Sequence, residues 1–219
     1  MISLGKKTLA RVHTRLMGTV FKIQSFGLEH IPSHQQLLIA SNHASHLDYG
    51  VLKAALSKKI IAFGALAAAD YFFDQRWKRK ILLPLTNLVP VMRQGSFSLA
   101  LKEAETALTN GRSLLIFPEG TRSQTDALLP FRPGVGYLQR RSELPILPVF
   151  IEGTQKILPK GQTVPTGRDI RIHVGVPMTH EHCDKIVDGL RPAEAFVRIA
   201  EETRSRVLGL KKASVTGIR

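Results

Sequence analysis

Short apolar runs alternate with longer amphipathic stretches along most of the chain. Each run is followed by polar residues, which is typical of buried strands that end in loops. The runs cover residues 37–40, 60–69, 88–92, 113–117, 146–151 and 170–176. Apolar residues at helical spacing predict helices over residues 49–56, 70–83, 98–109, 131–141 and 192–208. Strands that alternate with helices predict an α/β fold, a single domain with a central, mostly parallel sheet flanked by helices.

The first residues carry a helical pattern of a different kind. Over residues 3–24, apolar side chains recur three and four positions apart, and basic side chains occupy another face. A basic amphipathic helix of this type binds anionic membrane interfaces, although a surface helix packed on the domain has the same pattern. We therefore predict an N-terminal amphipathic, membrane-associating segment over residues 1–30, a main domain over residues 31–210 and a basic tail over residues 211–219.

The charge of the chain points to an anionic partner. Lys and Arg total 31 against 17 Asp and Glu, which gives a formal net charge of +14. Such a balance favours an anionic membrane, a phosphorylated substrate or nucleic acid. No nucleic-acid-binding motif is present, so we predict a membrane surface as partner and no nucleic acid. The hydrophobic share of 43% against 22% charged residues is that of a folded protein.

Cysteine usage and hydropathy indicate where the protein acts. Cys183 is the only cysteine, so no disulfide forms within the chain, which favours a reducing compartment. No run approaches the roughly 20 apolar residues that a membrane-spanning helix needs. The first residues lack the apolar core of a secretory signal. We predict a peripheral protein on the cytoplasmic face of the cell membrane.

A histidine and an aspartate stand close together in Asn42-His-Ala-Ser-His-Leu-Asp48, directly after the first apolar run. A hydroxyl that attacks a thioester benefits from a base that removes its proton, and histidine suits this task near neutral pH. A carboxylate on the other ring nitrogen fixes the tautomer and stabilises the imidazolium. His43 in a loop and Asp48 at a helix start can meet in this way. Taken alone, the spacing favours a surface histidine beside a helix-capping aspartate.

Three further segments accompany this one in chain order: Val89-Pro-Val-Met-Arg93, Phe117-Pro-Glu-Gly-Thr-Arg-Ser123 and Leu147-Pro-Val-Phe-Ile-Glu-Gly153. Together with Asn42 to Asp48, they resemble the four ordered motifs of the glycerolipid acyltransferases. This family comprises the lysophosphatidic acid and glycerol-3-phosphate acyltransferases. The segment 117–123 matches its motif without a change and is the most specific of the four. The resemblance covers residues 42–153.

The resemblance implies that residues 31–210 form an acyltransferase domain. Its activity would be transfer of a fatty acyl group from acyl-CoA or acyl carrier protein to a lysophospholipid hydroxyl. The acceptor implied first is 1-acyl-sn-glycerol-3-phosphate, which would give phosphatidic acid in phospholipid biosynthesis. His43 would be the general base and Asp48 its orienting partner, with no acyl-enzyme, cofactor or metal. The residues implied to bind the acceptor are Arg93, Glu119, Gly120, Thr121 and Arg122.

One departure from the family pattern concerns the acceptor. Arg93 and Arg122 are the phosphate candidates, because a guanidinium holds phosphate oxygens bidentately. Many relatives also carry a lysine between the first two motifs, and the resemblance implies that it meets the acceptor phosphate. Here Ala67-Ala-Ala69 stands at that place, with Arg76 and Lys78 as nearby substitutes. The acceptor therefore stays open between 1-acyl-sn-glycerol-3-phosphate, glycerol-3-phosphate and a lysolipid without that phosphate.

Two interpretations come from other classes of protein. His43, His46 and Asp48 also suit zinc in a hydrolase, but such a site needs further ligands and the other histidines form no second motif. A non-catalytic basic protein that binds membranes or nucleic acid explains the charge but not the segment 117–123.

Overall fold

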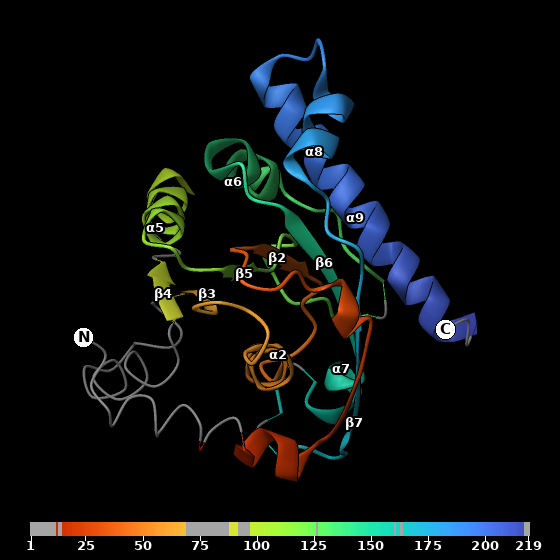
Figure 1. Ribbon diagram of the computed structural model, residues 1–219. Coiled ribbons are helices and arrows are strands. Elements are labelled where there is room, and N and C mark those ends of the chain that lie inside the picture. The colour runs from red at the N-terminus through yellow and green to blue at the C-terminus, as the bar shows by residue number, and fades with distance from the viewer. Residues whose placement is uncertain are drawn as a thin grey trace.

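A seven-stranded sheet lies at the centre of the protein, with strand order β1-β7-β6-β2-β5-β3-β4 (Figure 1). The computed structural model describes residues 12, 15–68, 88–91, 97–125, 127–159, 161–162 and 164–216. The strands are β1 (Lys22–Phe26), β2 (Leu38–Ser41), β3 (Gly64–Ala68), β4 (Leu88–Val91), β5 (Leu114–Ile116), β6 (Ile146–Glu152) and β7 (Asp169–Val174). Neighbouring strands are parallel except for the antiparallel pair of β6 and β7. The predicted fold class, an α/β domain with a mostly parallel sheet, is confirmed.

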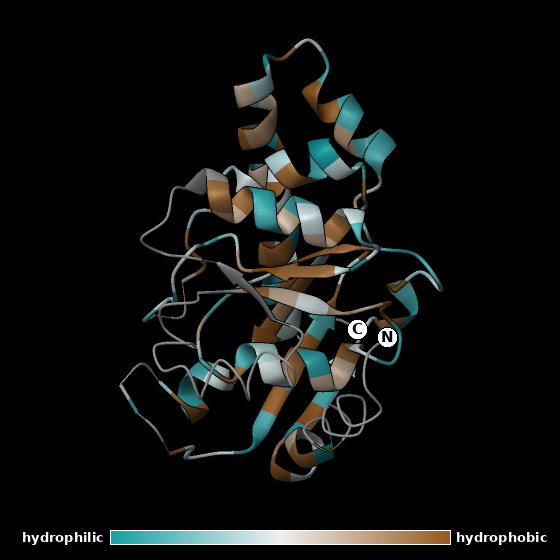
Figure 2. Ribbon diagram, turned by 90° about the vertical axis from the view of Figure 1, so that its left-hand side faces the viewer, coloured by the Kyte–Doolittle hydropathy of each residue, from teal (hydrophilic) through white to brown (hydrophobic). Residues whose placement is uncertain are grey.

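Helices cover both faces of the sheet. They are α2 (Asp48–Leu56), α5 (Phe97–Thr109), α6 (Gly134–Ser142), α7 (Thr154–Ile157), α8 (His180–Val187) and α9 (Pro192–Thr216), with a 3-10 turn η1 (Leu28–His30). One core cluster joins the sheet to α2 and α7, and another joins it to α5, α6, α8 and α9. Figure 2 shows hydrophobic residues concentrated in the central strands, whereas the helices around them carry both hydrophobic and hydrophilic residues. The result is a three-layer arrangement of helix, sheet and helix.

The central strand β2 explains why the sequence shows an unbroken apolar run. Leu37 and Ile39 point into the α2 side of the core, whereas Leu38 and Ala40 point into the α5 and α9 side. All four side chains are fully buried. A strand covered on both faces reads as continuously apolar rather than alternating.

The structure corrects the prediction for the N-terminal segment. Residues 15–20 are helical, but the helix predicted over 3–24 does not continue, because residues 22–26 form β1 and pair with β7 in the sheet. In β1 every second side chain is more buried, as in a strand with one covered face. The predicted boundary at residue 30 is therefore wrong: residues 22–26 belong to the main domain.

The C-terminal end is also more regular than predicted. The tail predicted over 211–219 is wrong for residues 211–216, because α9 continues through Thr216. Lysine and alanine at 211–213 favour a helix, and neither proline nor a turn signal ends it earlier. Helices α7 and α8 were not predicted, since α7 has four residues and α8 is mostly polar. The predicted helix 70–83 lies outside the described residues.

The order of the strands creates a natural place for a site. β2 lies between β5 on one side and β6 on the other, and all three run in the same direction. The loops after parallel strands meet at one edge of the sheet, and ligands bind where the chain leaves neighbouring strands in opposite directions. The described helices include none that is long and apolar enough to cross a membrane.

Candidate active site

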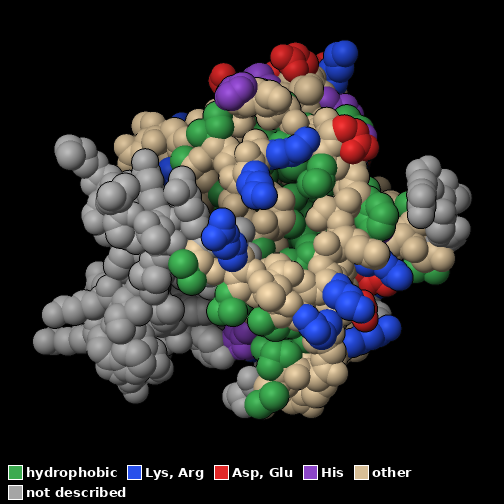
Figure 3. Space-filling model, turned by 60° about the horizontal axis from the view of Figure 1, so that its bottom comes forward, with side chains coloured by type: hydrophobic (Ala, Val, Ile, Leu, Met, Phe, Trp, Pro, Cys, Tyr) green, Lys and Arg blue, Asp and Glu red, His purple; other side chains and the backbone are tan. Residues whose placement is uncertain are grey.

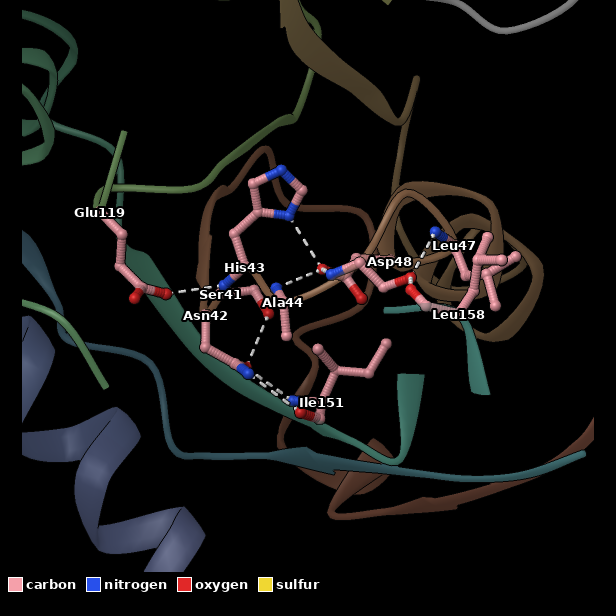
Figure 4. Close-up of polar contacts among 10 residues, drawn as sticks. Ser41, Asn42, His43, Ala44, Leu47, Asp48, Glu119, Ile151 and Leu158 are labelled. Carbon is pink, nitrogen blue, oxygen red and sulfur yellow. Dashed lines mark hydrogen bonds and ion pairs between the residues drawn. The ribbon is translucent and has the colours of Figure 1, made fainter. Parts of the chain in front are cut away.

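The loop after β2 brings His43 and Asp48 together (Figure 4). His43 Nδ1 lies 2.8 Å from Asp48 Oδ2. The aspartate side chain is fully buried, whereas the histidine side chain is 24% exposed. Among the described residues none hydrogen-bonds to Nε2 of His43, so this nitrogen is available to a substrate. The buried carboxylate therefore fixes the ring from behind while the other ring nitrogen faces outward.

Asp48 is held in place by the same loop that it orients. Its Oδ2 also accepts hydrogen bonds from the backbone N–H groups of Ala44, at 2.7 Å, and Ser45, at 2.9 Å. Asp48 is the first residue of α2, where a negative charge interacts favourably with the helix dipole. Three donors thus converge on one carboxylate oxygen, which makes the loop and the start of α2 a single rigid unit.

Asn42 ties this unit to the neighbouring strand β6. Its Nδ2 donates to the carbonyl of Ile151 at 2.9 Å, and its Oδ1 accepts from the N–H of Ile151 at 2.8 Å. Ser45 links the loop to the end of α7, because its hydroxyl donates to the carbonyl of Leu158 at 2.7 Å. The side-chain amide of Asn42 thereby makes the two hydrogen bonds to the Ile151 backbone that another strand residue would make with its own backbone. The position of His43 follows from the position of β6.

Glu119 supports the loop after β2 from the other side. One carboxylate oxygen accepts from the N–H of His43 at 2.7 Å and the other from the N–H of Leu129 at 2.9 Å. The side chain is only 4% exposed. Burial raises the pKa of Glu119, and the two backbone hydrogen bonds act in the opposite direction. Sequence reasoning assigned Glu119 to the acceptor, but this geometry supports a role in positioning His43.

The turn after β5 completes the surroundings of His43. The Phe117 ring stacks on the imidazole with centroids 4.1 Å apart and planes inclined by 15°. The N–H of Ser123 donates to the carbonyl of His43 at 2.8 Å. The turn therefore contacts His43 at two places: Phe117 stacks on its ring, and Ser123 hydrogen-bonds to its backbone carbonyl.

Two arginines lie at this turn: Arg122 belongs to it, and Arg132 reaches it from the start of α6. Arg122 is half-buried, and its Nη1 is buried without a hydrogen-bond partner among the described residues. Arg132 lies beside Gly120, where a Cβ would come within 2.7 Å of Arg132 Nε. Gly120 also has a φ of +70°, which disfavours any residue with a side chain. Thr121 is exposed in this turn. The unpartnered Nη1 of Arg122 and the Arg132 side chain beside Gly120 suit an anionic ligand.

The predicted site residues are largely brought together. His43, Asp48 and Glu119 are linked by direct hydrogen bonds or through the His43 backbone, and the turn of Gly120, Thr121 and Arg122 adjoins them. Arg93 lies outside the described residues. Sequence reasoning missed Arg132 and the stacking of Phe117 on His43. An arginine directly before the Pro133-Gly134 helix start was the only local signal for Arg132.

The alternative chemistries find no support at other positions. Cys183 is fully buried, and burial raises the pKa of its thiol to about 11, so it stays protonated and out of reach. The zinc hypothesis needed further ligands, and in the part of the chain that the structure describes no group of three His, Cys, Asp or Glu side chains is arranged to hold a metal ion. The histidine dyad is thus the centre around which the site is built.

Known proteins are similar to this chain in sequence. A family model described as Acyltransferase matches residues 22–152. A chloroplastic 1-acyl-sn-glycerol-3-phosphate acyltransferase of Brassica napus is 30% identical over 186 residues, which cover 83% of this chain and 51% of that protein. The 1-acyl-sn-glycerol-3-phosphate acyltransferase alpha of Homo sapiens is 26% identical over 163 residues, covering 73% of this chain and 56% of that protein. The chain spans about half the length of these relatives.

A solved structure shows the same fold. The crystal structure of the 1-acyl-sn-glycerophosphate acyltransferase PlsC from Thermotoga maritima matches with a TM-score of 0.68 and 24% identity, covering 94% of this chain and 79% of that chain. The family model covers more than half of the chain and includes the dyad and the turn after β5. The resemblance noted in the motifs is therefore confirmed, and the chain belongs to the Acyltransferase family.

Proposed function

We propose that the protein transfers a fatty acyl group from a thioester to the hydroxyl of 1-acyl-sn-glycerol-3-phosphate, giving phosphatidic acid. The observation that carries this proposal is the outward-facing Nε2 of His43 in a dyad whose carboxylate is fully buried. The names of the relatives from Brassica napus and Homo sapiens supply the acceptor. The donor, acyl-CoA or acyl carrier protein, follows from the family resemblance.

The reaction needs no group beyond the chain and its two substrates. His43 Nε2 accepts the proton as the acceptor oxygen bonds to the thioester carbon. The carbon–sulfur bond then breaks, and the proton on His43 passes to the departing thiolate, which leaves as a free thiol. Asp48 stabilises the imidazolium that exists between these two transfers. Removing the base is expected to slow such a reaction by about 10²–10⁴-fold.

Arg122 and Arg132 supply the recognition of the acceptor phosphate in this proposal. Only a few bonds separate the reacting hydroxyl from the phosphate, so the phosphate must bind close to His43. The buried Nη1 of Arg122, which has no hydrogen-bond partner among the described residues, fits this requirement, since a buried donor is costly until an acceptor such as a phosphate oxygen arrives. Ala67 and Ala68, at the end of β3, bring no cation of their own.

A panel of acceptors tests the reaction and its acceptor together. The purified protein would receive palmitoyl-CoA or palmitoyl carrier protein with 1-acyl-sn-glycerol-3-phosphate, glycerol-3-phosphate or monoacylglycerol, in detergent micelles. We expect free thiol release and phosphatidic acid with the first acceptor. A higher rate with monoacylglycerol would show that no phosphate is recognised. Absence of thiol release with every pair would contradict acyl transfer.

We also propose that the protein acts as a peripheral protein on the cytoplasmic face of the membrane. Val12, Leu16 and Val20 lie four residues apart and are 54%, 55% and 40% exposed, which leaves one apolar stripe uncovered. Figure 3 looks at the molecule from that end and shows basic and apolar side chains interspersed on the surface. This combination favours an interface with anionic headgroups.

Liposome binding tests the membrane proposal separately from catalysis. Leu16→Ser with Val20→Ser is expected to weaken binding to vesicles that contain anionic lipid. Raising the salt concentration is expected to act in the same direction. Val164→Ser is the control, because Val164 is an apolar residue elsewhere on the surface and is 70% exposed. Equal binding by all variants would place the membrane contact on another surface.

A further inference from the structure

Arg204 of α9 holds the loop that leads from the turn after β5 to α6. Its Nη2 donates to the carbonyl of Leu128 at 2.7 Å, and its Nε donates to the carbonyl of Leu129 at 3.0 Å. The side chain of Leu128 belongs to one buried cluster with Phe150 and Val207, and Val207 lies three residues further along α9. The helix therefore fixes both the backbone and a side chain of this loop.

The peptide group between Leu128 and Leu129 lies between two charged side chains. Its carbonyl, on Leu128, accepts from Arg204, and its N–H, on Leu129, donates to Glu119 Oε2 at 2.9 Å. A trans peptide is planar, so its C=O and N–H point in opposite directions. The guanidinium thus sets the direction in which the N–H meets the carboxylate. A cation at the oxygen and an anion at the N–H also polarise the peptide in the same sense, which strengthens both hydrogen bonds.

Glu119 connects this peptide to His43. Its other carboxylate oxygen, Oε1, accepts from the N–H of His43 at 2.7 Å (Figure 4). The Glu119 side chain is buried, so losing either partner would leave a buried acceptor oxygen without its hydrogen bond. We call the series from Arg204 through the 128–129 peptide and Glu119 to His43 the Arg204 relay. The position of the His43 backbone depends on this relay.

We propose that Arg204 is a positioning residue for His43 and acts through the Arg204 relay. This role rests on the proposed acyl transfer, in which His43 is the base. A base must lie within hydrogen-bond reach of the hydroxyl that it deprotonates. A small displacement of His43 therefore slows the proton transfer while both substrates remain bound.

The helix that carries Arg204 is a rigid support. A Cβ on Gly136 of α6 would come within 2.2 Å of the carbonyl oxygen of Phe196, so α6 and α9 pack closely at this point. Thr203, next to Arg204, is fully buried. Groups that position a reacting side chain act most precisely when they belong to packed secondary structure. Through the Arg204 relay, α9 extends this support to the loop after β2.

Arg206 provides a matched comparison on the same helix. Like Arg204, it is half-buried and bound by hydrogen bonds. Its Nε donates to Glu202 on α9 at 2.9 Å, and its Nη2 lies 3.1 Å from His182 on α8. These contacts join α8 to α9 and are separate from the Arg204 relay. Arg206→Ala thus removes a guanidinium from α9 and leaves the relay intact.

Kinetics of the full-length protein test the role of Arg204. Arg204→Ala should lower kcat for phosphatidic acid formation about tenfold and change the KM of each substrate by less than about twofold. Arg206→Ala should leave kcat within about twofold of wild type. Arg204→Lys keeps the charge and the apolar stem but lacks the planar fork for two carbonyls, so it should lose only about threefold in kcat. Full wild-type kcat in both Arg204 variants would overturn the proposed role.

A double-mutant cycle tests whether Arg204 acts through Glu119. Glu119→Gln places an NH2 group where the carboxylate has its second acceptor oxygen, which breaks the Arg204 relay. In this background Arg204→Ala should lower kcat by less than about threefold further. A further loss of about tenfold would show that Arg204 acts by another route and would overturn the relay.

Amide hydrogen exchange, followed by NMR, needs no turnover and separates this role from the proposed function. Arg204→Ala should speed the exchange of the His43 and Leu129 amides about tenfold. The amides of Ala44 and Ser45, which donate to the Asp48 carboxylate, should keep their wild-type rates. Arg206→Ala should change none of these amides.

The pattern of exchange decides between the outcomes. Wild-type protein without transferase activity but with this pattern would contradict the proposed function and keep the Arg204 relay. Unchanged exchange at His43 in Arg204→Ala would overturn the relay. Equal acceleration at Ala44 and Ser45 would overturn it as well, because the substitution would then have loosened the whole loop after β2.

Discussion

Two histidine–aspartate pairs with similar sequence spacing have different surroundings in this molecule. In the loop after β2, His43 Nδ1 lies 2.8 Å from Asp48, and on α8 His180 Nε2 lies 3.2 Å from Asp184. The Asp48 side chain is fully buried, whereas that of Asp184 is 47% exposed and also contacts Arg140. The other nitrogen of His180 faces Gln139.

The difference supports the proposed role of His43, and not of His180, as a base. A buried carboxylate interacts strongly with an imidazolium, whereas an exposed one is screened by water and salt. His43 keeps Nε2 open to substrate, and His180 uses both ring nitrogens within the protein. Burial of the carboxylate and a ring nitrogen without a partner among the described residues, more than spacing, therefore distinguish the pair that we propose as catalytic from the pair on α8.

The largest effect is expected from removing each histidine in turn. His43→Ala should lower kcat for phosphatidic acid formation by about 10²–10⁴-fold, because the general base is lost. His180→Ala should leave kcat within about twofold. Circular dichroism of both variants checks that they are folded. Similar losses for the two variants would erase the distinction between the pairs.

Replacing each aspartate tests the role of burial. Asp48→Asn should lower kcat by about 10²-fold or more, since the amide neither stabilises the imidazolium nor holds the same tautomer. Asp184→Asn should leave kcat unchanged and alter the free energy of unfolding by less than about 1 kcal/mol, as for an exposed ion pair. Steady-state rates and urea unfolding measure both. A fully active Asp48→Asn protein would rule out the orienting role.

Asn42 and Gln139 are the buried amide side chains beside these two pairs. Replacing them should change the free energy of unfolding by different amounts. Asn42→Leu is expected to lower the free energy of unfolding by about 2–3 kcal/mol, because it leaves both backbone groups of Ile151 unpaired. In Gln139 the buried Oε1 already has no partner in the described part of the chain. Gln139→Leu should therefore cost less than about 1 kcal/mol in urea unfolding. The reverse ranking would count against Asn42 as the anchor of the loop.

The smallest expected effect is the pH dependence that Glu119 gives to the free energy of unfolding. Burial raises its pKa above the ordinary value of 4.5, so the native state binds this proton more tightly than the unfolded state. The contribution of Glu119 to stability therefore falls as the pH rises from about 4.5 through the native pKa. Glu119→Gln removes this dependence, and its stability relative to wild type should improve over that pH range. Urea unfolding at several pH values measures the difference in the free energy of unfolding between the two proteins. A difference that does not change with pH would show that the pKa of Glu119 is not raised.

Local sequence patterns predicted the centre of the fold better than its edges. β2 is recognisable because burial on both faces gives an unbroken apolar run. β1 was taken as helix, because Val20 and Ile23 continue the apolar spacing of the preceding residues although β1 is an edge strand with mixed exposure. α8 was missed because residues such as His180 and Asp184 give it little apolar signal.

Local sequence patterns have the same limit at the site. Family motifs identified His43 and Asp48, which lie close in sequence. The groups that hold them are remote: Asn42 meets Ile151 across 109 positions, and Glu119 meets His43 across 76. Such contacts arise only when strands β2, β5 and β6 come together, so no local sequence pattern predicts them.

The central claim is that His43 acts as the general base for a hydroxyl nucleophile. The most direct test compares wild type with His43→Ala on two acceptors, 1-acyl-sn-glycerol-3-phosphate and its analogue with a thiol in place of the reacting hydroxyl. A thiol ionises near pH 8.5 and needs little help from a base. The loss caused by His43→Ala should be about 10²–10⁴-fold with the hydroxyl and no more than about tenfold with the thiol. Equal losses with both acceptors would contradict the account.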